Sequence, residues 1–346
     1  MDIRAFSQRT AARPVWLSYG LMAVVLVLVG VLNLGFPFIA ALFAYLALTK
    51  LHFVKNRGHW LPVVIFIVLV AAFAYGLGYV INQAVRVLPE VAENAIPSVI
   101  QLAKQHQIEL PFTDYDSLKD VALDTVRSQA HNLAGVAKIA RGATSQFVLV
   151  LVAMVVAIGM FLNPRFELDG EKSAIPNNLY SVSCAAIGQR FTTLYQSFAT
   201  VMGAQVVISA MNTVFTAIFV LSVRLPYAVV VIGTTFLCGL LPIVGNLIAN
   251  CIVVGIAITV SPKLAIAALV FLVVIHKLEY FLNSKIVGER IRNPFWLTLL
   301  ALILGERLMG IPGMILAPVV LNYIKMETRR IEVPCPSHDS PGPTTD

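Results

Sequence analysis

The stretch FLCGLLPIVGNLIANCIVVG, residues 236–255, decides the architecture. It is apolar and long enough to cross a lipid bilayer, for which about 20 residues suffice. Pro242, Gly245 and Asn246 nevertheless lie in its middle, where an uninterrupted spanning helix would carry Leu or Val. Irregular backbone at membrane depth is tolerated only where protein surrounds it or a water-filled cavity touches it. The stretch therefore predicts a broken helix beside a polar cavity.

The composition of the whole chain is that of a membrane protein. Of 346 residues, 58% are hydrophobic and 12% are charged, and the mean hydropathy is +0.82. A soluble domain needs more polar residues to cover its surface, so we predict an all-α, polytopic integral membrane protein. The net charge of +7 does not indicate nucleic acid, because most Lys and Arg residues flank apolar segments. The four cysteines lack metal-binding spacing, and we expect neither a metal nor a cofactor.

About eight apolar segments follow one another along the chain. They cover approximately 15–32, 36–49, 61–81, 145–162, 198–222, 226–260, 264–282 and 295–325. The sixth and the eighth are too long for one crossing, and each is interrupted by Pro and Gly. We predict that each is a re-entrant helical hairpin, with tips shaped by Pro242 and Gly245 and by Pro312 and Gly313. The alternative is a tight turn between two full spans at the membrane surface. The first turn carries no charge, which favours a submerged tip.

The basic residues predict an orientation and four regions. Clusters of Lys and Arg precede the first segment and follow the second and the last, and such clusters belong in the cytoplasm. Both termini are then cytoplasmic, in the inner membrane if the source is bacterial. The regions are 1–82 with three transmembrane helices, 83–142 with extracytoplasmic amphipathic helices, 143–326 with the transmembrane transport region, and 327–346 with a disordered cytoplasmic tail. Within 83–142 we expect helices broken at Pro89, Pro97 and Pro111.

Signatures of enzyme chemistry are absent from the sequence. The chain has no GxxxxGK[ST], HExxH or GxSxG pattern, so P-loop ATPases, zincins and serine hydrolases of those classes are not supported. The apolar segments also lack the Ser/His or Asp/Asp pair of an intramembrane protease. We therefore expect a protein that is not an enzyme, and transport is the function class that remains.

Three rows of polar residues at helical spacing could line a transport pathway. They are Gln205, Ser209, Asn212, Thr213 and Thr216; then Asn246 and Asn250; then His276, Glu279, Tyr280 and Asn283. We predict solute contacts by Gln205, Asn212, Asn246 and Asn250, although such residues also join helices by hydrogen bonds. His276 and Glu279 are candidates for coupling to a proton or cation, since ionisable residues in a span are often functional. The alternative for Glu279 is a side chain that reaches the membrane interface.

The last third of the chain resembles the autoinducer-2 exporter family of bacterial permeases. The resemblance rests on Glu279, on Lys285-Ile286-Val287-Gly288, on Pro294, on Gly310 and Gly313, and on Ala317-Pro318. LLPIVGNLIA, residues 240–249, resembles the Pro-x-Ile/Val-Gly element of that family. Ser284 departs from the pattern, because the family usually has a proline there, and the helix is expected to continue through it.

This resemblance implies export of small molecules across a membrane. Members are linked to the signalling sugar derivative autoinducer-2, and others to sodium/proton exchange. It also implies a homo-oligomer, such as a pentamer, with the broken helices in a mobile transport unit.

The leading hypothesis is a permease or exporter of a small polar solute, driven by an ion gradient or passive. Its partners are then the solute, the lipid bilayer and Na⁺ or H⁺. One alternative is a sodium/proton antiporter. Another is a non-transporting membrane scaffold that recruits partners through residues 83–142.

Overall fold

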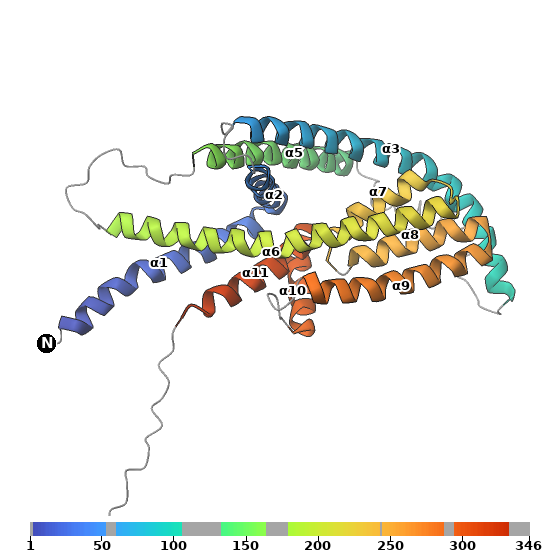
Figure 1. Ribbon diagram of the computed structural model, residues 1–346. Helices are drawn as coiled ribbons and strands as arrows, with labels where there is room; N and C mark the ends of the chain where they lie inside the picture. The colour runs from blue at the N-terminus through green and yellow to red at the C-terminus, as the bar shows by residue number, and fades with distance from the viewer. Residues whose placement is uncertain are drawn as a thin grey trace, which may run out of the picture.

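The computed structural model describes residues 3–52, 60–105, 133–163, 179–242, 244–286 and 294–331. Side chains are described in these ranges except at 3–15, 133–143, 179–180, 279–286 and 295 and in most of 84–105. The described part of the chain consists of ten helices and contains no strand (Figure 1). The predicted all-α class is confirmed. The helices are α1 (Ile3–Val31), α2 (Gly35–Leu51), α3 (Trp60–Gln105), α5 (Leu133–Leu162), α6 (Leu179–Ser222), α7 (Ala228–Gly239), α8 (Val244–Val260), α9 (Pro262–Ile286), α10 (Phe295–Met309) and α11 (Ile311–Thr328).

Three stretches of helix are long and apolar enough to cross a membrane: Trp60–Gln83, Thr144–Leu162 and Ser181–Ser222. Within the first two, only 6% and 11% of the most apolar window is buried inside the protein. Large apolar side chains such as Val68 and Phe73 on α3 and Phe147 and Val155 on α5 point outward. Such extended apolar surface requires a cover of lipid or protein.

Helix α6 is the axis of the molecule (Figure 1). Its first half packs against α1, α2 and α11 in a core around Phe198 and Met202. Its second half packs against α7 and α9, and α8 joins them in a second core around Val231 and Val253. A third core joins α2 to α3 and α5. The 44 residues of α6, about 66 Å long, therefore connect both of the predicted broken segments.

Both long apolar segments are interrupted where the sequence predicts. The first divides into α7 and α8, and the second divides into α10 and α11 at Gly310, which has a positive φ of 63°. Pro242 lies in the turn between α7 and α8, whereas Gly245 is the second residue of α8. Pro312 and Gly313 lie in the first turn of α11, where a proline is well tolerated because its missing N–H has no helical partner.

Close backbone contact explains the glycines at both breaks. A Cβ on Gly245 would lie 1.6 Å from the carbonyl oxygen of Cys238, so no other residue fits the α7–α8 turn as it stands. A Cβ on Gly313 would lie 1.7 Å from the carbonyl oxygen of Gly305, which holds α10 directly against α11. The start of α2 meets the same hairpin, because a Cβ on Gly35 would lie 2.6 Å from Cβ of Pro312.

Several helices are longer than the sequence predicts. Helix α3 passes through Pro89 and Pro97 without interruption, so the predicted breaks there are wrong; Pro111 lies outside the described residues. A proline removes one hydrogen bond and bends a helix, but α3 has 46 residues and keeps its other bonds on both sides. Figure 1 shows that α3 bends in its second half. Helix α6 starts at Leu179 rather than near residue 198, and α11 includes residues 327 and 328 of the predicted tail. Helix α9 continues through Ser284, as predicted.

Candidate functional site

The polar row of α6 meets the break between α7 and α8. Carbonyl groups in the last turn of a helix lack intrahelical partners. Here the Gln205 amide donates to the carbonyl oxygen of Gly239 at 2.6 Å, and the Ser209 hydroxyl donates to that of Phe236 at 2.7 Å. Gly239 allows this approach, since a Cβ there would lie 2.6 Å from Oγ of Ser209. These two residues of α6 therefore support the broken backbone.

The next two turns of α6 open onto a small cavity between α6, α7, α8 and α9. It is lined by Asn212, Thr216, Thr235, Asn246, Ala249, Asn250, Leu272, Ile275 and His276. The volume that the centre of a water molecule can occupy is about 10 Å³, so the cavity has room for about one water. Asn212, Thr216 and Thr235 are each at most 5% exposed, so the polar groups are held in the protein interior.

The lining offers hydrogen bonds without a fixed charge. It contains three carboxamides, two hydroxyls and one imidazole, and among the described lining residues no carboxylate, lysine or arginine. A carboxamide both donates and accepts, whereas the Thr235 hydroxyl already donates to the carbonyl oxygen of Val231 at 2.8 Å. Such a set of groups suits a neutral, hydrogen-bonding guest better than an ion, because burying a charge requires an opposite charge or many oriented dipoles.

Four of the predicted site residues come together at this cavity. Asn212 comes from α6, Asn246 and Asn250 from consecutive turns of α8, and His276 from α9. Their functional roles stay predictions. Gln205 lies outside the cavity and bonds the end of α7 instead. Helix α9 includes Glu279, but the side chain of Glu279 lies outside the described residues.

The remaining predicted residues lie at the two breaks. Gly245 directly precedes Asn246 and Pro242 lies four residues before it, so the α7–α8 turn positions one wall of the cavity. Pro312 and Gly313 contact Gly35 and Gly305, in a part of the structure that does not line the cavity. Thr235 of α7 is a lining residue that the sequence did not single out, because its place in the middle of a short apolar helix gives no periodic polar signal.

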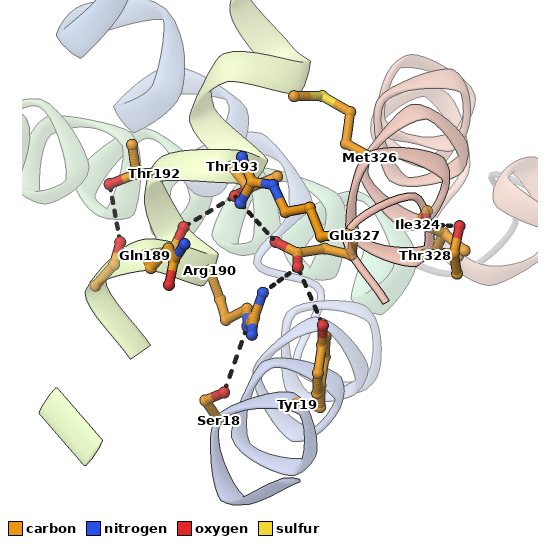
Figure 2. A network of polar contacts seen from close by, with 12 residues as sticks. Ser18, Tyr19, Gln189, Arg190, Thr192, Thr193, Ile324, Met326, Glu327 and Thr328 are labelled. Carbon is orange, nitrogen blue, oxygen red and sulfur yellow. Dashed lines mark hydrogen bonds and ion pairs between the residues drawn. The ribbon is translucent and has the colours of Figure 1, made fainter. Parts of the chain in front are cut away.

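A second polar cluster, also missed, lies near the start of α6. There Arg190 forms a buried ion pair with Glu327 of α11, and Tyr19 of α1 donates a hydrogen bond to the same carboxylate at 3.2 Å (Figure 2). Arg190 is 7% exposed and Glu327 is 3% exposed. The available signal was a lone arginine one turn before the apolar run that includes Leu194 and Phe198. Among the described residues, no group of three His, Cys, Asp or Glu side chains could hold a metal ion.

Comparison with known proteins agrees with a transport function. Residues 16–331 match the model of a family described as "AI-2E family transporter". A stretch of 142 residues is 28% identical to a Bacillus subtilis (strain 168) protein named "Putative transport protein YdbI". That alignment covers 40% of each chain. Three of the helices are long and apolar, and most of their apolar side chains face outward, as in a multi-pass membrane protein. Because the family match extends over most of the sequence, this chain belongs to the AI-2E family of transporters.

Proposed function

We propose that the chain is a permease or exporter of a small, polar solute that binds in the cavity between α6, α7, α8 and α9. The observation that carries the proposal is the gathering of Asn212, Asn246, Asn250 and Thr216 at one cavity beside a broken helix. Transporters place substrate sites where discontinuous helices expose main-chain dipoles and polar side chains at membrane depth. Membership of a transporter family supports the same class of function.

The length of α7 supports a re-entrant α7–α8 hairpin. Its 12 residues rise about 18 Å, well short of the ~30 Å hydrocarbon core. The turn that follows is bonded to Gln205 and Ser209, which precede the end of α6 by 17 and 13 residues, or about 26 and 20 Å. A tip at that depth needs partners for its carbonyl groups, and α6 supplies them.

The α10–α11 hairpin approaches the same level of α6 from the other end. The Ser197 hydroxyl donates to the carbonyl oxygen of Val319 at 2.7 Å, and Arg190 pairs with Glu327, so α11 is antiparallel to α6. Ile311 lies eight residues before Val319, or about 12 Å, which corresponds to Gln205 on α6. This geometry supports two hairpins with opposed tips. Glu306 and Arg307 next to the second tip have exposed side chains, which favours a polar environment for that tip.

The cavity lining favours an uncharged solute with several hydroxyl groups. An autoinducer-2-like sugar derivative meets this description, and its hydroxyls would exchange hydrogen bonds with the asparagine carboxamides. The cavity as described holds about one water, so a sugar-sized solute requires α7 and α8 to move away from α6 or α9.

The exposed apolar faces indicate what surrounds the transporter. Lipid or a second copy of the chain covers α3 and α5, and we propose a homo-oligomer in the bacterial inner membrane. Both chain ends are proposed to be cytoplasmic. In support, Figure 1 shows the start of α1, the start of α6 and the end of α11 on the same side of the molecule.

A sodium/proton antiporter is a second candidate, favoured by the position of His276 at the cavity. A histidine in a transport pathway is a candidate for a proton relay, which would couple a pH gradient to the site. Solute and ion transport are distinguished by replacing Glu279 and His276, because an antiporter loses its pH-dependent cation flux whereas a solute permease retains solute flux.

The proposal is tested with the full chain in proteoliposomes. A panel of labelled neutral and anionic solutes of up to sugar size, autoinducer-2 among them, is offered with and without an imposed pH gradient. We expect faster uptake of at least one neutral hydroxylated solute than in empty liposomes. The proposal is wrong if no solute moves faster, or if only cations do.

A further inference from the structure

The Arg190–Glu327 cluster joins three helices that are far apart in the sequence. Arg190 of α6 and Glu327 of α11 are 137 residues apart, and Ser18 and Tyr19 belong to α1. The Arg190 side chain donates from Nε to the Ser18 hydroxyl at 3.4 Å, and its guanidinium lies 4.2 Å from the centroid of the Tyr19 ring. Figure 2 shows Arg190 and Tyr19 meeting at the Glu327 carboxylate, with Ser18 bonded to Arg190.

A third charged residue completes the cluster from the end of α11. Arg330 lies 3.9 Å from Oε1 of Glu327, and it also donates to the Thr193 hydroxyl of α6 at 2.8 Å. The cluster therefore fixes both the distance and the register between α11 and α6. A shift of α11 by one turn would separate two buried charges from their partners, which is strongly unfavourable in a low-dielectric interior.

Neutral contacts hold the rest of the α10–α11 hairpin in the same register. Ser197 donates to the carbonyl oxygen of Val319 and accepts from the Asn322 amide at 3.0 Å. Gly305 and Gly313 bring the backbones of α10 and α11 into direct contact, and Gly35 of α2 does the same at Pro312. The hairpin is thus fixed to α1, α2 and α6.

The described contacts of the α7–α8 hairpin are neutral, in contrast to the ion pair of α11. The tip of this hairpin is bonded to α6 by the neutral side chains of Gln205 and Ser209. Among the described residues, no ion pair joins α7, α8 or α9 to another helix. Leu247 on α8 is 66% exposed. Asn246 and Asn250 in the first turns of α8 border the cavity, and its later turns pack in the core around Val231 and Val253.

We propose that the Arg190–Glu327 pair anchors α11 to α6 and α1, so that the α10–α11 hairpin is a fixed element of the transporter and the α7–α8 hairpin is the moving wall of the cavity. This rests on the proposed transport function. Arg190 and Glu327 are positioning residues, because neither lines the cavity. The two broken segments, similar in sequence pattern, then have different mechanical roles.

Hydrogen exchange of the full chain in lipid nanodiscs, followed by mass spectrometry, tests the assignment without any solute. We expect the amides of α11 to exchange at least about tenfold more slowly than those around the α7–α8 turn, because opening α11 must break a buried ion pair and no described ion pair holds that turn. Comparable exchange in the two segments would overturn the proposal, and this comparison needs no variant.

Variants then test the ion pair itself. Glu327→Gln and Arg190→Gln are expected to raise exchange in α11 by at least about tenfold, and Arg190→Lys, which keeps the charge, by less. Glu306→Gln is the matched control, because that carboxylate is exposed, and it leaves α11 unchanged. Unchanged exchange in α11 after Glu327→Gln, or equal effects of Arg190→Gln and Arg190→Lys, would overturn the proposal. A negative solute screen would instead refute the proposed function and leave the exchange result standing.

Discussion

Replacing Arg190 by methionine is expected to destabilise the folded protein severely. The change removes the direct partner of a carboxylate that is only 3% exposed, and removing one partner of a buried pair costs about 3–5 kcal/mol. The Tyr19 hydroxyl at 3.2 Å and Arg330 at 3.9 Å remain and partly compensate the charge of Glu327. We therefore expect a loss near the lower limit, about 3 kcal/mol of the free energy of unfolding.

The double variant Arg190→Met/Glu327→Met separates the ion pair from the general packing of the site. Two apolar side chains of similar length leave no unpaired carboxylate, so we expect a loss of about 1–2 kcal/mol, well below the sum of the single losses. Unfolding in mixed micelles titrated with SDS, followed by circular dichroism, gives the four free energies of the cycle. The matched control is Arg307→Met, whose side chain is 83% exposed and whose loss should stay under about 1 kcal/mol. Additive single losses, or a single loss no larger than the control, would refute the reasoning.

Three further predictions concern the α7–α8 hairpin. Gly245→Ala should prevent accumulation of folded protein in membranes, because its Cβ would lie 1.6 Å from the carbonyl oxygen of Cys238. Gly255→Ala should accumulate normally, because no neighbouring element in the described structure comes within 4 Å of its Cβ. Gln205→Leu leaves the carbonyl of Gly239 without its donor and should lower the free energy of unfolding by about 1–2 kcal/mol in the same titration; an unchanged value contradicts the assigned bond. Asn246→Leu and Asn250→Leu should each reduce solute uptake at least about tenfold at normal protein levels, whereas Asn163→Leu at the exposed end of α5 should not.

The sequence was most informative about where helices stop. A break in a long apolar segment has few explanations in lipid, and Pro242, Gly245 and Gly310 therefore predict the divisions between α7 and α8 and between α10 and α11. The four-residue spacing of Asn246 and Asn250 likewise predicts a shared face, and both residues line the cavity.

Other features depend on tertiary contacts that have no local signal. Gln205, Ser209 and Asn212 have helical spacing whether their side chains bond a neighbouring carbonyl or face a cavity. The sequence therefore could not show that Gln205 and Ser209 bond carbonyl groups while Asn212 lines the cavity. Arg190 and Glu327 meet only because α11 runs antiparallel to α6. At Pro89 and Pro97 the local signal was present but misleading. Proline disfavours a helix interior, yet α3 continues through both residues.

The most direct test of the central claim compares two neighbouring threonines of α6. Thr216 lines the cavity and is 3% exposed, whereas the Thr213 hydroxyl donates to the carbonyl oxygen of Ser209 in its own helix at 2.7 Å. Valine keeps the shape of threonine and removes only the hydroxyl, so both variants should fold. In proteoliposomes with the solute found by the screen, Thr216→Val is expected to slow uptake at least about tenfold and Thr213→Val less than about twofold. Equal rates in the two variants would show that the cavity is not where the solute binds.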